Sequence, residues 1–199
     1  MKCNARSKPL LAVVLSISLF ATGCSAEWIK VALADLPVLV QMALNLGTLA
    51  TTLQSGRQLN PAETAAIQNI AAEAGRDLNL LQILYNEYKA NPDADAIQKI
   101  QAVITEINQN LPGLLHSAHI VDPVLATRIT SAVNLILSTV NSFASLIPQT
   151  ATPLTAQKMA RRKTVVPHAE DLKKQWNQQV CGPTGRAVLD ASFAACSVR

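Results

Sequence analysis

The sequence is poor in the residues and motifs that build catalytic loops. It has 7 glycines among 199 residues, and aromatic side chains make up only 4% of the chain. It contains no GxSxG or SxxK motif of a serine nucleophile and no glycine-rich loop that would hold a phosphate. These absences predict a non-enzymatic protein that requires no cofactor.

Strong charge of one sign is also missing once the chain is divided by region. The formal net charge is +4, but residues 24–150 carry six basic and ten acidic side chains, whereas residues 151–199 carry eight basic and three acidic ones. The chain after residue 23 is therefore nearly neutral. Its overall basicity does not predict a nucleic-acid partner.

Aliphatic side chains, by contrast, are abundant. Hydrophobic residues make up 49% of the chain, and the low aromatic content means that most of them are aliphatic. This composition is typical of helices that pack through small and aliphatic side chains. The length fits one compact domain, so we predict a single all-α body.

The first 24 residues have the pattern of an export signal. Three basic residues at positions 2, 6 and 8 precede an apolar run from Leu10 to Phe20, and small residues then lead to Cys24. This run is shorter than the roughly 20 residues that a membrane-spanning helix needs. We therefore predict that residues 1–23 are a signal peptide that is removed.

The end of this signal, Ala21-Thr22-Gly23-Cys24, resembles the lipobox of bacterial lipoproteins. The resemblance covers only the first 24 residues, and Ala21 stands where leucine is usual. It implies that Cys24 is lipidated, with acyl chains such as palmitate, and becomes a mature N-terminus anchored to the membrane of the cell envelope. Ser25 implies outer-membrane delivery, facing the periplasm, in a cell with two membranes. Ordinary cleavage after Ala26 is the alternative, and it would leave the protein without lipid.

Four stretches between Glu27 and Ile147 carry apolar residues three or four positions apart, which places them on one face of a helix. The first stripe is Leu36, Leu39, Ala43, Leu46, Ala50 and Leu53, and the second is Ile67, Ala71, Ala74, Leu78, Leu81, Tyr85 and Tyr88. The third is Ile97, Ile100, Ile104, Ile107, Leu111 and Leu114, and the fourth is Leu125, Ile129, Val133, Ile136, Val140, Phe143 and Ile147.

Capping residues and prolines separate these stretches. Asn60-Pro61 and Asp122-Pro123 each place a capping side chain before a proline at the first helical position. Short connections make successive helices antiparallel, so we predict an up-down-up-down four-helix bundle over residues 24–148. Pro37 predicts a kink or a fresh helix start, and Pro112-Gly113 predicts that the third helix bends or ends early.

The segment from Trp28 to Leu46 is apolar on more than one face. This pattern fits either the most buried helix of the bundle or a helix resting on lipid, while Lys30 and Asp35 argue against a membrane span. We expect burial, with Trp28 close to the membrane surface.

The tail divides into a basic linker, residues 149–167, and a short helical C-terminal segment, residues 168–199. The linker holds the basic cluster Lys158, Arg161, Arg162 and Lys163. This cluster could be part of a solvated connector, could bind anionic lipid headgroups, or could dock on the acidic bundle. In the C-terminal segment Cys181 and Cys196 remain as an even pair once Cys3 leaves with the signal and Cys24 takes lipid. An oxidising compartment then predicts a structural disulfide between them.

Few side chains are candidates for a metal site. His116 and His119 stand three residues apart and could share a metal if that turn stays helical, although no third ligand stands nearby in the sequence. Asp35, Asp77 and Glu106 lie within helical stretches and could face inward together, yet the Glu-x-x-His pairs of a di-iron bundle are absent. Solvated surface positions are the simpler interpretation of both sets.

Two functional hypotheses follow from these patterns. The first is a membrane-anchored envelope lipoprotein whose bundle is a structural or interaction module for other envelope proteins. The second is an envelope protein that binds a small apolar ligand, such as a lipid chain, between helices lined by Ala43, Ala50, Ala71 and Ala74. The same small residues also fit close helix packing.

Overall fold

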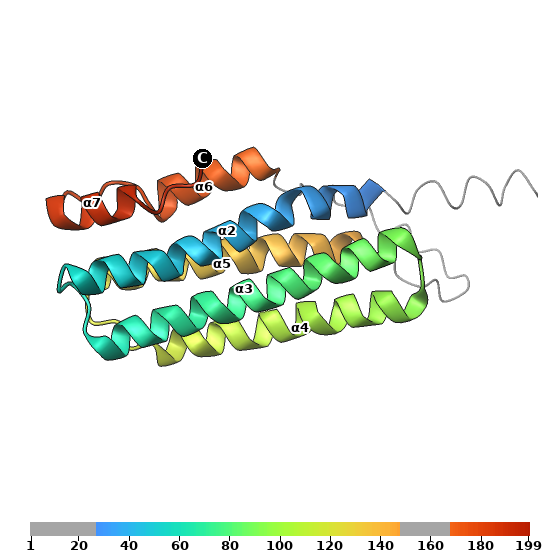
Figure 1. Cartoon of the computed structure of the whole chain (residues 1–199), viewed down its shortest axis with the longest axis horizontal. Coiled ribbons are helices and arrows are strands. Elements are labelled where there is room, and N and C mark those ends of the chain that lie inside the picture. The colour runs from blue at the N-terminus through green and yellow to red at the C-terminus, as the bar shows by residue number, and fades with distance from the viewer. Residues whose placement is uncertain (1–26, 148–167) are drawn as a thin grey trace, which may run out of the picture.

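The computed structural model describes residues 27–147 and 168–199, and every regular element in these two stretches is a helix. The helices are α2 (Glu27–Ser55), α3 (Pro61–Ala90), α4 (Ala94–Ser117), α5 (Pro123–Leu146), α6 (Ala169–Gln179) and α7 (Ala187–Ala194). The four long helices run alternately up and down, and α6 and α7 lie along one side of them (Figure 1). The predicted all-α bundle with a helical C-terminal segment is confirmed.

The predicted capping residues begin two of the long helices. Asn60 and Glu63 form a reciprocal capping box at the start of α3: the Glu63 amide donates to Asn60 Oδ1 over 2.9 Å, and the Asn60 amide donates to Glu63 Oε2 over 3.0 Å. Asp122 accepts hydrogen bonds from the backbone amides of Val124 and Leu125 at the start of α5. Each of these side chains satisfies amide groups that the first helical turn leaves without partners.

The four apolar stripes form the core. Every residue of the first, second and fourth stripes is buried, and in the third stripe only Ile97 and Leu114 are partly exposed. Between α2 and α3 the packing is close, since a Cβ atom placed on Gly47 would lie 3.4 Å from the Cβ atom of Ala71. Small residues in this seam allow the two helix backbones to approach each other.

The alternatives of a fresh helix start at Pro37 and an early helix end at Pro112 were wrong. Helix α2 continues through Pro37, and α4 continues through Pro112 to Ser117. Pro37 lies on the exposed face, while Ala32 and Leu36 before it and Leu39 after it are all buried. Burial on both sides of Pro37 holds one continuous helix at the expense of one backbone hydrogen bond, a loss of about 3 kcal/mol. Residues 27–36 are therefore continuous with the rest of α2.

Helices α2 and α5 are long and apolar enough to cross a membrane by length and composition alone, over Trp28–Ser55 and Pro123–Leu146. A core helix passes the same test. Both helices supply buried stripes to this bundle, and Trp28 itself is only 8% exposed because it packs against Tyr85 and Tyr88 of α3, with ring centroids 5.5 and 5.8 Å away. The predicted burial of the segment from Trp28 to Leu46 is confirmed.

One end of the bundle receives both undescribed segments of the chain. Helix α2 begins there and α5 ends there, next to the end of α3 and the start of α4 (Figure 1). Residues 1–26 and 148–167 therefore join the bundle at the same end. We call it the α2-start end.

Candidate functional site

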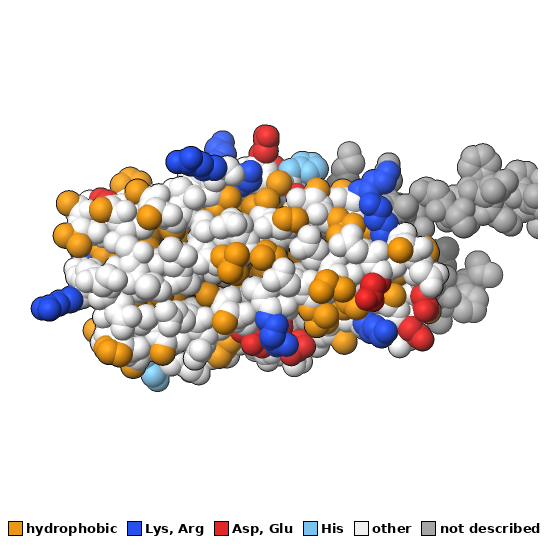
Figure 2. All heavy atoms as spheres, viewed as in Figure 1, with side chains coloured by type: hydrophobic (Ala, Val, Ile, Leu, Met, Phe, Trp, Pro, Cys, Tyr) orange, Lys and Arg blue, Asp and Glu red, His pale blue; other side chains and the backbone are white. Residues whose placement is uncertain are grey.

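An acidic cluster lies on the seam between α3 and α4. The guanidinium Nη2 atom of Arg76 lies 2.6 Å from Glu73 Oε1, 2.7 Å from Asp77 Oδ1 and 3.4 Å from Glu106 Oε1. Figure 2 shows a basic side chain flanked by acidic ones over the middle of these two helices. Glu73, Arg76 and Asp77 belong to α3 and Glu106 to α4, so the cluster joins two helices.

Asp77 is the buried member of this cluster. Its side chain is 0% exposed, compared with 29% for Glu73, 45% for Glu106 and 55% for Arg76. Neither carboxylate oxygen of Asp77 has a hydrogen-bond partner, and Arg76 provides its ion pair. The pKa of Asp77 is raised to about 6. Burial is the main cause, and the negative charges of Glu73 and Glu106 add to it, while Arg76 acts in the opposite direction.

A shallow groove runs beside the cluster. It has a volume of about 590 Å³ and is lined by Asn69, Ala72, Glu73, Gln109, Asn110, Gly113 and Leu114. The Asn110 Nδ2 atom lies 3.4 Å from Glu73 Oε1. An amide group and solvent therefore border the carboxylates on this side.

The two histidines proposed as metal ligands are not placed on one helical turn. Helix α4 ends at Ser117, so only His116 belongs to it, and His119 adopts a left-handed backbone with φ 39°. Both side chains are exposed. The predicted metal site required both histidines to lie on one helical turn, and they do not.

Asp35 is separate from the acidic cluster and has a different partner. It accepts a hydrogen bond from the backbone N–H of Ala169, at the start of α6, and is only 2% exposed. His168, the residue at the N-cap position of α6, makes no capping hydrogen bond with its side chain. Burial raises the pKa of Asp35, while the Ala169 amide and His168 lower it. Asp35 of α2 thus takes the capping role for α6 and joins the C-terminal segment to the bundle.

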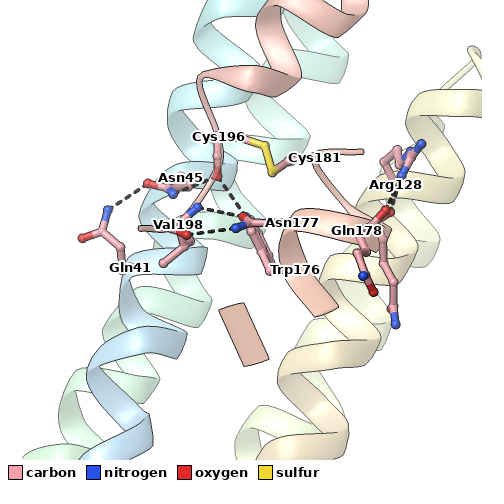
Figure 3. The surroundings of a disulfide bond; sticks show 10 residues. Gln41, Asn45, Arg128, Trp176, Asn177, Gln178, Cys181, Cys196 and Val198 are labelled. Atoms are coloured by element: carbon pink, nitrogen blue, oxygen red, sulfur yellow. Dashed lines mark hydrogen bonds between the residues drawn. A yellow bond between two sulfur atoms is a disulfide. The ribbon is translucent and has the colours of Figure 1, made fainter. Parts of the chain in front are cut away.

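The C-terminal segment forms a helical hairpin that is closed by the predicted disulfide. Cys181 and Cys196 are bonded, with their Cα atoms 6.1 Å apart. Inside the hairpin Trp176 is fully buried, and its Nε1 atom donates to the Cys196 carbonyl oxygen over 2.9 Å (Figure 3). Asn177 pairs with the backbone N–H and carbonyl of Val198, both at 2.9 Å. These contacts make the disulfide part of a packed structural unit.

The bundle holds this hairpin from two helices. From α2, Asn45 donates to the Cys196 carbonyl over 3.0 Å. From α5, Arg128 donates to the carbonyl of Gln178 (Figure 3) and to those of Gln179 and Pro183. Its guanidinium group also lies over the ring of Phe193. Arg128 places a positive charge at the C-terminal end of α6, where the helix dipole favours it.

Gly182 is required where the hairpin turns. A Cβ atom at this position would lie 2.5 Å from the backbone carbonyl oxygen of Gln178, a distance that no side chain can accept without movement of the main chain. The turn that follows is held by Asp190, which accepts hydrogen bonds from the amide and hydroxyl of Thr184, both at 2.6 Å.

The four alanines proposed to line a ligand site are buried between the helices. Ala43 and Ala71 also border an open groove of about 370 Å³ between α2 and α3, together with Leu44, Gly47, Thr48, Thr51, Gln68 and Ala72. The side chain of Leu44 beside it is 57% exposed. The close approach of Gly47 and Ala71 shows that small residues in this seam serve helix packing.

Several predicted features lie outside the described residues. These are the signal peptide, the lipid-accepting Cys24 and the linker cluster of Lys158, Arg161, Arg162 and Lys163.

Sequence reasoning missed two partners that the structure brings in. Solvated surface positions were the preferred interpretation for Asp35, Asp77 and Glu106, and this was wrong for Asp35 and Asp77, which are buried. The structure brings Asp77 and Glu106 into one cluster, which Glu73 and Arg76 complete. Arg76 follows Glu73 by three positions, the spacing of an ion pair on one helix face, and this signal was available in the sequence. The contact of Arg128 with residues 50 to 55 positions away left no local signal.

Comparison of the chain with protein-family models, with curated proteins and with solved structures gives no match.

Proposed function

We propose that this protein is a non-enzymatic lipoprotein of the cell envelope, anchored through acyl chains on Cys24, whose helical bundle is a structural or interaction module. The motif that motivates the anchor is Ala21-Thr22-Gly23-Cys24. The fold adds support, because the exported part is a water-facing bundle with its apolar stripes turned inward. Such a body needs a separate device to stay on a membrane, and lipidation provides one.

The observation that carries the proposal is the position at which α2 begins. Only Ser25 and Ala26 separate Cys24 from Glu27, the first residue of α2. The first turn of α2 is already part of the core, with Trp28 8% and Ile29 3% exposed. An acyl anchor on Cys24 would therefore hold the α2-start end of the bundle directly at the bilayer surface. Cleavage after Ala26, by contrast, would leave a chain that begins at the helix itself.

The basic linker supports the same orientation. It follows Ile147, at the α2-start end, and contains the cluster of Lys158, Arg161, Arg162 and Lys163. A bundle anchored by this end would bring those charges within reach of anionic lipid headgroups, each worth about 1 kcal/mol near the surface. We therefore propose headgroup binding as the role of the linker cluster.

The anchor is tested with Cys24→Ala in the exporting host, with Cys3→Ala as the matched control because Cys3 lies in the signal peptide. We expect wild type and the control in the membrane fraction, with an N-terminal peptide that carries acyl mass. The Cys24→Ala protein should lack this mass and leave the membrane. Wild type that starts at Glu27 without lipid would overturn the proposal, as would a Cys24→Ala protein that stays equally membrane-bound.

The alternative function, binding of a small apolar ligand, is best assigned to the groove beside Leu44. Native mass spectrometry of the purified body tests it, because a bound lipid adds a defined mass. A copurifying lipid that is lost in Leu44→Gln would favour carriage over a purely structural role. Repeated absence of such a mass would rule carriage out.

A further inference from the structure

We propose that Glu73, Asp77 and Glu106 form a binding site for one divalent cation on the α3–α4 seam, and that Arg76 is the internal counter-ion which this cation displaces. The proposed ligand class is a hard cation such as Ca²⁺, Mg²⁺ or Mn²⁺. This site is independent of the membrane anchor, and no catalytic role is assigned to it.

The first argument is convergence. One carboxylate oxygen from each of the three residues lies within 4.8 Å of the others, and all three approach the same nitrogen atom of Arg76. The position of that nitrogen is therefore one at which a positive charge is already accommodated. In residues 27–147 and 168–199, no other three acidic, histidine or cysteine side chains bring their ligand atoms this close together.

The second argument is the state of Asp77. A buried carboxylate ordinarily accepts several hydrogen bonds, because an ionised group without partners is strongly disfavoured away from water. Asp77 is 0% exposed, and both of its oxygens lack a hydrogen-bond donor although Oδ1 faces Arg76 at 2.7 Å. Asp77 therefore brings a buried carboxylate oxygen to the centre of the cluster with an ion pair to Arg76 as its only polar partner, and a cation that replaced Arg76 would be coordinated by this oxygen.

The third argument is the exchangeability of Arg76. Its side chain is 55% exposed, so it can rotate into solvent without leaving a cavity in the core. The groove beside Glu73 gives water access to the remaining coordination positions, and Asn110 next to it carries an amide oxygen. Carboxylate, amide and water oxygens are the ligands that Ca²⁺, Mg²⁺ and Mn²⁺ prefer, whereas Zn²⁺ favours the histidine and cysteine ligands that this cluster lacks.

Binding is measured by isothermal titration calorimetry with CaCl₂ and with MnCl₂, on the exported chain after removal of metal with EDTA. We expect one ion per chain, with a Kd of about 0.1–1 mM for wild type, the range of extracellular calcium modules. Arg76→Ala removes the competing positive charge and should bind at least about tenfold more tightly, because the cation no longer has to displace a guanidinium group that contacts all three carboxylates. Glu106→Gln should bind at least about tenfold more weakly.

Glu87→Gln is the matched control, because Glu87 is an exposed acid on α3 outside the cluster. It should bind like wild type. Absence of saturable binding in both wild type and Arg76→Ala would overturn the proposal and leave the cluster as a permanent ion-pair network. Wild-type affinity in Glu106→Gln, whose side chain is 45% exposed, would equally overturn it.

Discussion

Asp77→Asn should make the folded protein more stable at neutral pH, although it removes one member of an ion pair. The pKa of Asp77 is about 6 in the folded state, compared with an ordinary value of 3.8. Such a difference corresponds to about 3 kcal/mol by which folding is opposed when the carboxyl is ionised. Water around the exposed Glu73, Arg76 and Glu106 screens part of this effect, so we expect a gain of about 1–3 kcal/mol.

The sign of the pH dependence follows from the raised pKa of Asp77. Well below the ordinary value of 3.8 the carboxyl is protonated in both the folded and the unfolded chain, so it does not affect the free energy of unfolding. As the pH rises from 3.8 through about 6, the unfolded chain loses its proton first and wild type becomes less stable. Asparagine cannot ionise. The advantage of Asp77→Asn is therefore small at pH 4, grows through pH 6 and is complete above it.

Urea unfolding of wild type and Asp77→Asn at several pH values between 4 and 8, in EDTA, measures this difference. Glu87→Gln, on the same helix outside the cluster, should show little change at any pH. For a folded body of this size, 1 kcal/mol corresponds to about 2–4 °C in Tm. A variant that is less stable than wild type at pH 7.5 would refute the reasoning. It would show that the pair with Arg76 outweighs the burial of the charge.

Three further changes and one exchange measurement test other parts of the structure. Replacing Cys181 and Cys196 with serine should lower the free energy of unfolding by about 3 kcal/mol, because the disulfide closes a loop of about 15 residues. Adding reductant should lower the stability of wild type by the same amount and leave the serine variant unchanged. Arg128→Ala should cost about 2 kcal/mol in urea unfolding and make the C-terminal hairpin more sensitive to protease. Pro37→Ala should raise the stability by about 1–3 kcal/mol, since Pro37 is exposed inside a continuous helix; an unchanged or lower Tm would contradict this. In hydrogen exchange, α4 amides should exchange faster than those of α5, and equal protection would be contrary to expectation.

The helices were predictable from the sequence because two local signals agree. The apolar stripes identified the buried faces, and the capping residues Asn60 and Asp122 marked where helices begin. The fresh start at Pro37 and the early end at Pro112 were wrong because a local rule conflicts with packing. Both prolines are exposed, but Pro37 has buried residues on both sides along α2, and Pro112 lies between buried Leu111 and the partly buried Leu114 and Leu115. That packing is not visible in a short window of sequence.

The candidate site was less predictable, because its geometry depends on how α3 and α4 are aligned along their lengths. Spacing of three and four positions places Glu73, Arg76 and Asp77 near one another on α3. Which residue of α4 meets them is decided by the packing of two stripes, and that alignment brings Glu106 to Arg76 across 30 positions. The same reasoning applies to Asp35, whose partner Ala169 lies far along the sequence and leaves no local signal.

The acidic cluster includes Glu106 of α4, a long helix that contributes fewer buried residues to the core than α5 does. Of two helices of 24 residues each, α4 buries five and α5 buries nine, so α4 depends more on polar contacts across its seams. Those contacts are the pairs of Glu106 with Arg76, Asn110 with Glu73 and Asn108 with Asn141 of α5. A cation held by Glu73, Asp77 and Glu106 would therefore act where the bundle opens most easily, and its binding should slow hydrogen exchange in α4 more than in α5. If Mn²⁺ protects all four long helices equally, the ion stabilises the fold as a whole and not this seam.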